Sequence, residues 1–215
     1  MSRILVIGAS KGIGKLTVET ALEHGHEVRA MSRSIDALDI THPALEKFKG
    51  DALEHDSVAA ALEGQDAVIQ TLGMPLNRET ITSKVTMFSH ATEILLKAMA
   101  EQKMRRVICL TGFGAGTSRV AMSALEMLGH GLILGKIYED KGRQEALIKA
   151  SDTDWTIARP VILTNFKASG KYAVLLDEPT WRNGLICRAD VADYLVRAVD
   201  DPATFGTEPV LARGR

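Results

Sequence analysis

The sequence predicts an α/β fold, a doubly wound parallel sheet flanked by helices, and two observations carry this prediction. Strand-like and helix-like segments alternate along most of the 215 residues, which is typical of parallel strands joined by crossover helices. The chain also begins with a short apolar segment, residues 3–7, that runs directly into the turn Gly8-Ala9-Ser10-Lys11-Gly12-Ile13-Gly14. No repeat, low-complexity tract or linker divides the chain, so we expect a single domain over residues 1–215.

Each element has its own local signal. Strands are expected at residues 3–7, 26–31, 45–48, 67–71, 107–110 and 155–158. Helices are expected over residues 13–24, 56–62, 81–99 and 190–201, the third carrying the clearest apolar stripe. Gly25 and Gly64 stand where two of these helices should stop, and Asp56 stands where a capping side chain should begin one. The carboxyl ends of the strands are therefore where a ligand site is expected.

The glycine turn predicts a phosphate-binding site. Gly8 allows a tight turn off the first strand, and Gly12 lets the main chain approach a pyrophosphate closely. Gly14 lets the helix pack against the strand, and the free N–H groups at the start of the helix attract an anion. Three glycines at fixed offsets also occur in ordinary turns. The strand before them and the amphipathic helix after them favour a dinucleotide-binding turn.

Composition and charge exclude several classes of protein. The chain has 26 basic and 27 acidic residues, a balance that argues against a nucleic-acid-binding surface. No apolar run is long enough to span a membrane, and Met1 leads almost directly into a strand instead of a signal peptide. Cys109 and Cys187 lie far apart, and the six histidines show no metal-ligand spacing. We expect a cytoplasmic protein without a metal, a monomer or a homodimer.

Several segments together resemble the short-chain dehydrogenase/reductase superfamily, in particular its atypical branch of biliverdin-IXβ/flavin reductases and NmrA-like proteins. These segments are the three glycines of the turn, Gly50-Asp51-Ala52, Gly73, Asp154-Trp155-Thr156-Ile157-Ala158-Arg159-Pro160 and Arg188-Ala189-Asp190-Val191-Ala192. The resemblance implies one NAD(P)-binding Rossmann domain with small substrate-side segments near residues 111–136 and 160–187. The expected cofactor-binding residues are Gly8, Ser10, Lys11, Gly12, Ile13, Gly14, Arg33, Asp51, Ala52, Thr71, Leu72, Gly73, Pro160, Val161 and Ile162.

The departures from the superfamily concern its proton relay. Members that act on alcohols and carbonyls use Tyr-x-x-x-Lys, and here Lys141 has Ile137 at the tyrosine position. Tyr138 is one position late, an offset of about 100° around a helix, which we expect to turn it aside. Thr111 stands where the fifth strand usually delivers a serine, next to Gly112. We therefore expect Thr111 and Lys141 at the reaction site, Lys141 as a residue that positions the nicotinamide ribose.

The end of the second strand predicts a preference for NADPH over NADH. An NAD-selective site usually has an acidic residue there, whereas this chain has Ser32-Arg33-Ser34 and no carboxylate before Asp36. The guanidinium of Arg33 can pair with a 2′-phosphate, assisted by the two serines and Lys11. A solvated surface arginine is the plainer alternative.

The remaining segments indicate an apolar substrate pocket. We expect Met74, Phe113, Met122 and Phe166 to line it, with Leu76 and the polar anchors Asn77 and Asn165 beside them. Residues 112–116 should form a loop over this site, and residues 120–135 a pocket wall, a dimer face or core. The leading hypothesis is an NADPH-dependent reductase of a flat conjugated acceptor: a flavin, a quinone or a tetrapyrrole. The alternatives are a non-catalytic NADP(H)-sensing regulator of NmrA type and a sugar-nucleotide epimerase/dehydratase-like enzyme.

Overall fold

The structure is a computed structural model that describes residues 1–75 and 84–214. Its strands are β1 (Arg3–Ile7), β2 (Glu27–Ser32), β3 (Leu45–Lys49), β4 (Ala67–Gln70), β5 (Arg106–Leu110), β6 (Asp154–Pro160), β7 (Ile162–Thr164), β8 (Tyr172–Leu175), β9 (Leu185–Cys187) and β10 (Val210–Arg213). Its α-helices are α1 (Gly12–Glu23), α2 (His55–Leu62), α4 (Met87–Glu101), α5 (Ala124–Lys149) and α6 (Arg188–Arg197).

Eight of these strands form one sheet in the order β3-β2-β1-β4-β5-β6-β10-β8. All neighbouring pairs are parallel except β10 and β8, which are antiparallel. The strand order reverses beside β1, where Ile4 pairs with Val28 of β2 on one side and Ala67 of β4 on the other. The predicted doubly wound parallel sheet is thus confirmed, and its switch point lies at the end of β1, where a ligand is expected.

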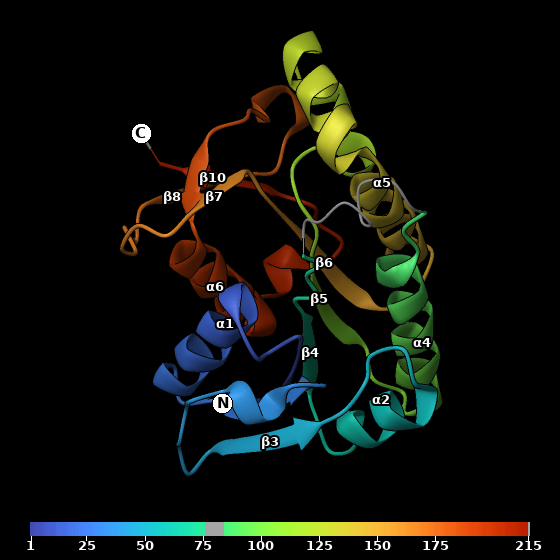
Figure 1. Ribbon diagram of the computed structural model, residues 1–215. Coiled ribbons are helices and arrows are strands. Elements are labelled where there is room, and N and C mark those ends of the chain that lie inside the picture. The colour runs from blue at the N-terminus through green and yellow to red at the C-terminus, as the bar shows by residue number, and fades with distance from the viewer. Residues whose placement is uncertain (76–83, 215) are drawn as a thin grey trace.

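Helices cover both faces of the sheet. Figure 1 shows α1 and α6 on one face, and α2, α4 and α5 on the other. The predicted apolar stripe of α4 is buried, with Phe88, Leu95 and Met99 each no more than 1% exposed. Because apolar side chains fill the space on both faces, the strands are fixed in position and only their ends are free to form a site.

Several boundaries differ from those expected. Asp56 lies inside the first turn of α2, where it makes no capping bond, because the helix already begins at His55. The helix expected from residue 81 begins at Met87, and residue 81 lies outside the described residues. Most of residues 120–135 belongs to α5, which the glycines in this segment had obscured. In the described part of the chain, no helix combines the length and the apolar character that crossing a membrane requires.

Candidate active site

A cavity of about 670 Å³ opens at the carboxyl edge of the sheet, where the switch point predicted it. Its walls come from the ends of β1, β2, β4, β5 and β6, with α4 and α5 closing one side. Of the residues expected in the site, it is lined by Gly8, Ser10, Lys11, Gly12, Ile13, Arg33, Asp51, Ala52, Thr71, Leu72, Gly73, Met74, Thr111, Lys141 and Pro160. Segments that lie far apart in the sequence thus meet at one place.

The glycine turn forms the floor of this cavity beside β1 and α1. A Cβ atom on Gly14 would lie 2.2 Å from the carbonyl oxygen of Gly8, so only glycine lets α1 come so close to the strand. Gly8 itself has a φ of +88°, and a Cβ there would lie 2.9 Å from the carbonyl oxygen of Thr71. The start of α1 can therefore present its unpaired N–H groups to an anion, and this geometry fits a pyrophosphate.

Hydroxyl groups and one cation gather where β2 ends. The hydroxyl of Ser32 donates to Ser10 Oγ at 3.0 Å, and that of Ser34 donates to the same atom at 3.3 Å. Arg33 is exposed, and its Nη1 lies 3.9 Å from Asp51 Oδ2. An arginine held by one long contact beside three hydroxyls can reorient toward a phosphate that enters the cavity.

Thr111 and Lys141 lie at the opposite side of the cavity, below β5. Lys141 Nζ donates to the carbonyl oxygens of Leu110 at 3.4 Å and Thr111 at 2.9 Å, and it lies 4.6 Å from the centre of the Phe88 ring. Burial lowers the pKa of the Lys141 amine below its ordinary value, because desolvation disfavours the charged form. The end of β5 thus fixes the amine at the cavity wall.

Tyr138 lines the same cavity, so the expectation that its helical offset turns it aside is wrong. The offset was measured from Ile137, but Tyr138 and Lys141 are three residues apart on α5 and therefore share a face. The tyrosine hydroxyl lies against Gly112, where a Cβ atom would come within 2.6 Å of it. Gly112 therefore makes room for Tyr138, and burial raises the pKa of its hydroxyl.

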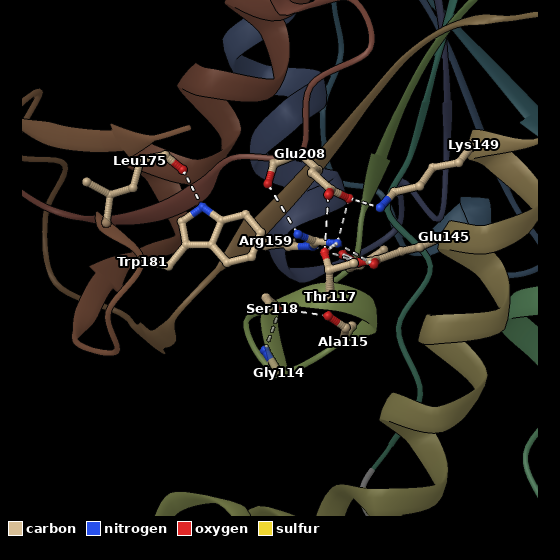
Figure 2. A network of polar contacts seen from close by, with 11 residues as sticks. Gly114, Ala115, Thr117, Ser118, Glu145, Lys149, Arg159, Leu175, Trp181 and Glu208 are labelled. Atoms are coloured by element: carbon tan, nitrogen blue, oxygen red, sulfur yellow. Dashed lines mark hydrogen bonds and ion pairs between the residues drawn. The ribbon is translucent and has the colours of Figure 1, made fainter. Parts of the chain in front are cut away.

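A buried ion pair lies behind Thr111. Arg159, at the end of β6, contacts Glu145 of α5 through Nη2–Oε2 at 2.6 Å and Nε–Oε1 at 3.1 Å. The guanidinium also reaches Glu208 Oε2 at 2.7 Å and lies 5.3 Å from the centre of the Trp181 ring. Figure 2 shows these groups converging on Arg159 from separate elements, with Lys149 reaching Glu208 from α5. No expectation from the sequence placed Glu145 or Glu208 at the site, because their distances to Arg159 depend on the fold.

Seven expected site residues do not line the cavity. Gly14 is buried beneath the turn, against Gly8, and Asn165 is exposed. Phe113 and Val161 are buried in the core between the sheet and the helices on the α1 side. Ile162 and Phe166 are exposed, the latter by 72%, because the chain after Pro160 turns away into β7. Met122 lines a separate cavity of about 210 Å³, which Tyr138 also borders. Leu76 and Asn77 lie outside the described residues.

The sheet order and the glycine turn at its switch point define a dinucleotide-binding protein of Rossmann type. A family model described as NAD(P)H-binding matches residues 8–202, and the chain belongs to this family. The expected resemblance to atypical short-chain dehydrogenases/reductases is confirmed.

Relatives of the chain differ in how much of it they match. An uncharacterized chloroplastic protein of Arabidopsis thaliana is 28% identical over an alignment of 221 positions, which covers 98% of this chain and 77% of that protein. A 3β-hydroxysteroid dehydrogenase/Δ5→4-isomerase of Mycobacterium tuberculosis is 38% identical over 71 residues, 33% of this chain and only 19% of that enzyme. Among solved structures, ChuY, an anaerobillin reductase from Escherichia coli O157:H7, is 25% identical with a TM-score of 0.81, covering 99% of this chain and 97% of ChuY.

Proposed function

We propose that this protein is an NADPH-dependent reductase that acts on a flat, conjugated acceptor such as a flavin, a quinone or a tetrapyrrole. The observation that carries the proposal is that one cavity joins the glycine turn and the hydroxyl and guanidinium groups at the end of β2 to Lys141 and Thr111. When bound, the nicotinamide supplies a hydride to the acceptor. The residues of the chain hold both molecules in place.

The preference for NADPH is supported by the groups at the end of β2. Arg33 and the hydroxyls of Ser10, Ser32 and Ser34 offer donors to a 2′-phosphate, and Lys11 lines the cavity beside them. No carboxylate occupies the position directly after the strand, where it would repel the phosphate and accept from a free ribose. Asp51, which contacts Arg33, is instead assigned to the adenine side, as the family resemblance implies.

The flat acceptor is supported by the apolar wall around Lys141. Its apolar members are Leu72, Met74, Met87, Phe88, Leu134 and Ile137. A conjugated acceptor spreads the charge that reduction creates, so it needs no strong acid beside it, and the protein need only position the two molecules closely. The similarity to ChuY over nearly the whole chain supports a tetrapyrrole as one member of this class.

Lys141 is proposed to position the cofactor. Two of its three N–H bonds are directed to the carbonyl oxygens of Leu110 and Thr111, which leaves one for the nicotinamide ribose. Replacing Lys141 with Ala should therefore raise the NADPH concentration needed for half-maximal turnover. Replacing Tyr138 with Phe should retain most activity, since the acceptor is proposed to take its proton from solvent. Loss of turnover in Tyr138→Phe with NADPH binding intact would instead make Tyr138 a proton donor.

The proposal is tested by following NADPH oxidation at the nicotinamide absorbance band with a panel of acceptors. Riboflavin, menadione and biliverdin should accelerate oxidation, whereas small aliphatic aldehydes and secondary alcohols should not. Rapid, saturable turnover of an aliphatic carbonyl, with none of the flat acceptors reduced, would overturn the assignment. NADPH binding without turnover of any acceptor would favour a regulator that only senses the nucleotide.

A further inference from the structure

The hydroxyl group of Thr111 donates its proton to a buried carboxyl group and not to the cavity. Thr111 follows β5 directly, is 5% exposed and lines the cavity. Its Oγ1 donates to Glu145 Oε1 at 2.7 Å. A threonine hydroxyl carries one proton and two lone pairs. The bond to Glu145 uses the proton, and the lone pairs remain to accept a hydrogen bond.

The direction of this hydrogen bond is fixed by Arg159. Glu145 is 1% exposed and Arg159 is fully buried, and two contacts join the guanidinium to the carboxyl group. A guanidinium carries only donors, so both carboxyl oxygens of Glu145 accept from it, Oε1 from Nε and Oε2 from Nη2. Thr111 must therefore be the donor in its bond with Glu145.

The surroundings of Arg159 keep this arrangement in place. Its Nη2 also donates to Thr117 Oγ1 at 3.0 Å, and Trp181 lies over the guanidinium (Figure 2). Trp181 is itself held by a hydrogen bond from Nε1 to the carbonyl oxygen of Leu175 at 3.0 Å. A buried charge with this many partners is costly to move, so Glu145 cannot easily turn away from Thr111.

From this geometry we propose that Thr111 accepts a hydrogen bond from the bound ligand and does not donate one. No donor to Thr111 Oγ1 is recorded among the residues that the structure describes, so its lone pairs are available there. The inference deepens the proposed function, on which it rests: the site selects a ligand that carries an N–H group at this point. A serine that donates to a substrate oxygen, as the superfamily usually has, would select the opposite chemistry.

Two ligands can supply the N–H group, the ring system of the acceptor or the carboxamide of the nicotinamide. The first is probed with lumiflavin and 3-methyllumiflavin, which differ only in whether a ring nitrogen carries hydrogen or methyl. The second is probed with NADPH and its 3-acetylpyridine analogue, which has no carboxamide N–H. Equilibrium binding of each probe is measured by fluorescence, so the result does not depend on turnover.

Thr111→Val and Thr111→Ser are the matched variants. Valine has the shape of threonine without the hydroxyl, whereas serine keeps it, and Arg159 still holds Glu145 in both. We expect the unmodified protein and Thr111→Ser to bind the N–H member of one pair on the order of tenfold more tightly. Thr111→Val should bind both members of that pair alike. A purely steric effect of the methyl group would persist in Thr111→Val and would overturn the inference.

Glu145→Gln provides the second test. An amide both donates and accepts, so Thr111 can reverse its hydrogen bond and the discrimination between the two members should fall. Glu208 remains to pair with Arg159 in this variant. Equal binding of both members of each pair by the unmodified protein would contradict the inference, and so would discrimination that Glu145→Gln leaves unchanged. Discrimination without turnover would remove the reductase proposal but leave this inference standing.

Discussion

The side of the cavity beneath β1 is formed by the main chain, whereas the side beneath β5 and β6 is held by buried charges. At the first, Gly14 and Gly8 approach each other so closely that no side chain fits between them. At the second, Glu145 and Arg159 join α5 to the sheet, and Glu208 ties in the chain before β10. The first side offers donors that suit any pyrophosphate, and the second orients particular side chains. The two sides therefore depend on different kinds of interaction, and separate substitutions can test each of them.

Removal of Arg159 should have the largest effect, because it leaves the carboxylate of Glu145 buried without its partner. We expect Arg159→Met to lower the free energy of unfolding by about 3–5 kcal/mol, measured by urea denaturation. Arg105→Met is the matched control, since Arg105 pairs with Asp154 at 3.0 Å on the surface and should matter little. Equal effects of the two substitutions would show that the buried network does not stabilise this side.

Gly14→Ala tests the main-chain side. The added Cβ would lie 2.2 Å from a carbonyl oxygen, which cannot move without shifting β1 or α1. We expect a loss of about 1–3 kcal/mol in the free energy of unfolding, together with weaker NADPH binding. Gly184→Ala should change neither, because among the described residues no atom outside its own chain neighbours lies within 4 Å of a Cβ there. Unchanged NADPH binding in a folded Gly14→Ala protein would separate this packing from nucleotide binding.

Gly112→Ala tests the contact between the end of β5 and α5. Its Cβ would lie 2.6 Å from the Tyr138 hydroxyl, the far end of a side chain that can shift, so we expect a loss of about 1 kcal/mol. Tyr138→Phe removes the closest atom, and the double variant should therefore lose less than the sum of the two single changes. If the loss in the double variant equals the sum of the losses in Gly112→Ala and Tyr138→Phe, Gly112 does not accommodate Tyr138.

The smallest expected effect is on the pH dependence of stability. The folded-state pKa of Lys141 is lowered from 10.5 by burial, so between the two values the unfolded chain binds more protons. The free energy of unfolding should therefore rise with pH through that window in the unmodified protein, relative to Lys141→Met. Burial raises the pKa of Tyr138 and Tyr194 in both proteins, which makes the free energy of unfolding fall as the pH rises. The quantity to measure is therefore the difference between the stability curves of the unmodified protein and Lys141→Met. A difference that falls with rising pH would contradict the burial of a charged amine.

The sequence predicted the main-chain side well and the charged side poorly, for a physical reason. Gly8, Gly12 and Gly14 are close in sequence, and their spacing follows directly from the turn that they form. The ends of β2 and β4 could likewise be located, because each strand is a short apolar run. The doubly wound sheet followed from the same local signals.

Side-chain placement below β5 and β6 depends on contacts between distant residues. Glu145, Arg159 and Glu208 meet only in the fold, and no local pattern reports their distances. Phe166 was expected in the pocket because it follows β6, but the chain turns into β7 first. The spacing of Tyr138 and Lys141 was the one local signal available, since residues three apart share a helix face, and it should have placed Tyr138 at the cavity.

The proposed binding of NADPH beside Arg33 is tested most directly by titrating the unmodified protein and Arg33→Ala with NADPH and with NADH. We expect the unmodified protein to bind NADPH more tightly than NADH. In Arg33→Ala, NADPH binding should weaken on the order of ten- to a hundredfold, as for the loss of a charged hydrogen bond, while NADH binding stays nearly constant. Equal affinities of the unmodified protein for the two nucleotides, or an equal loss of both in Arg33→Ala, would contradict it.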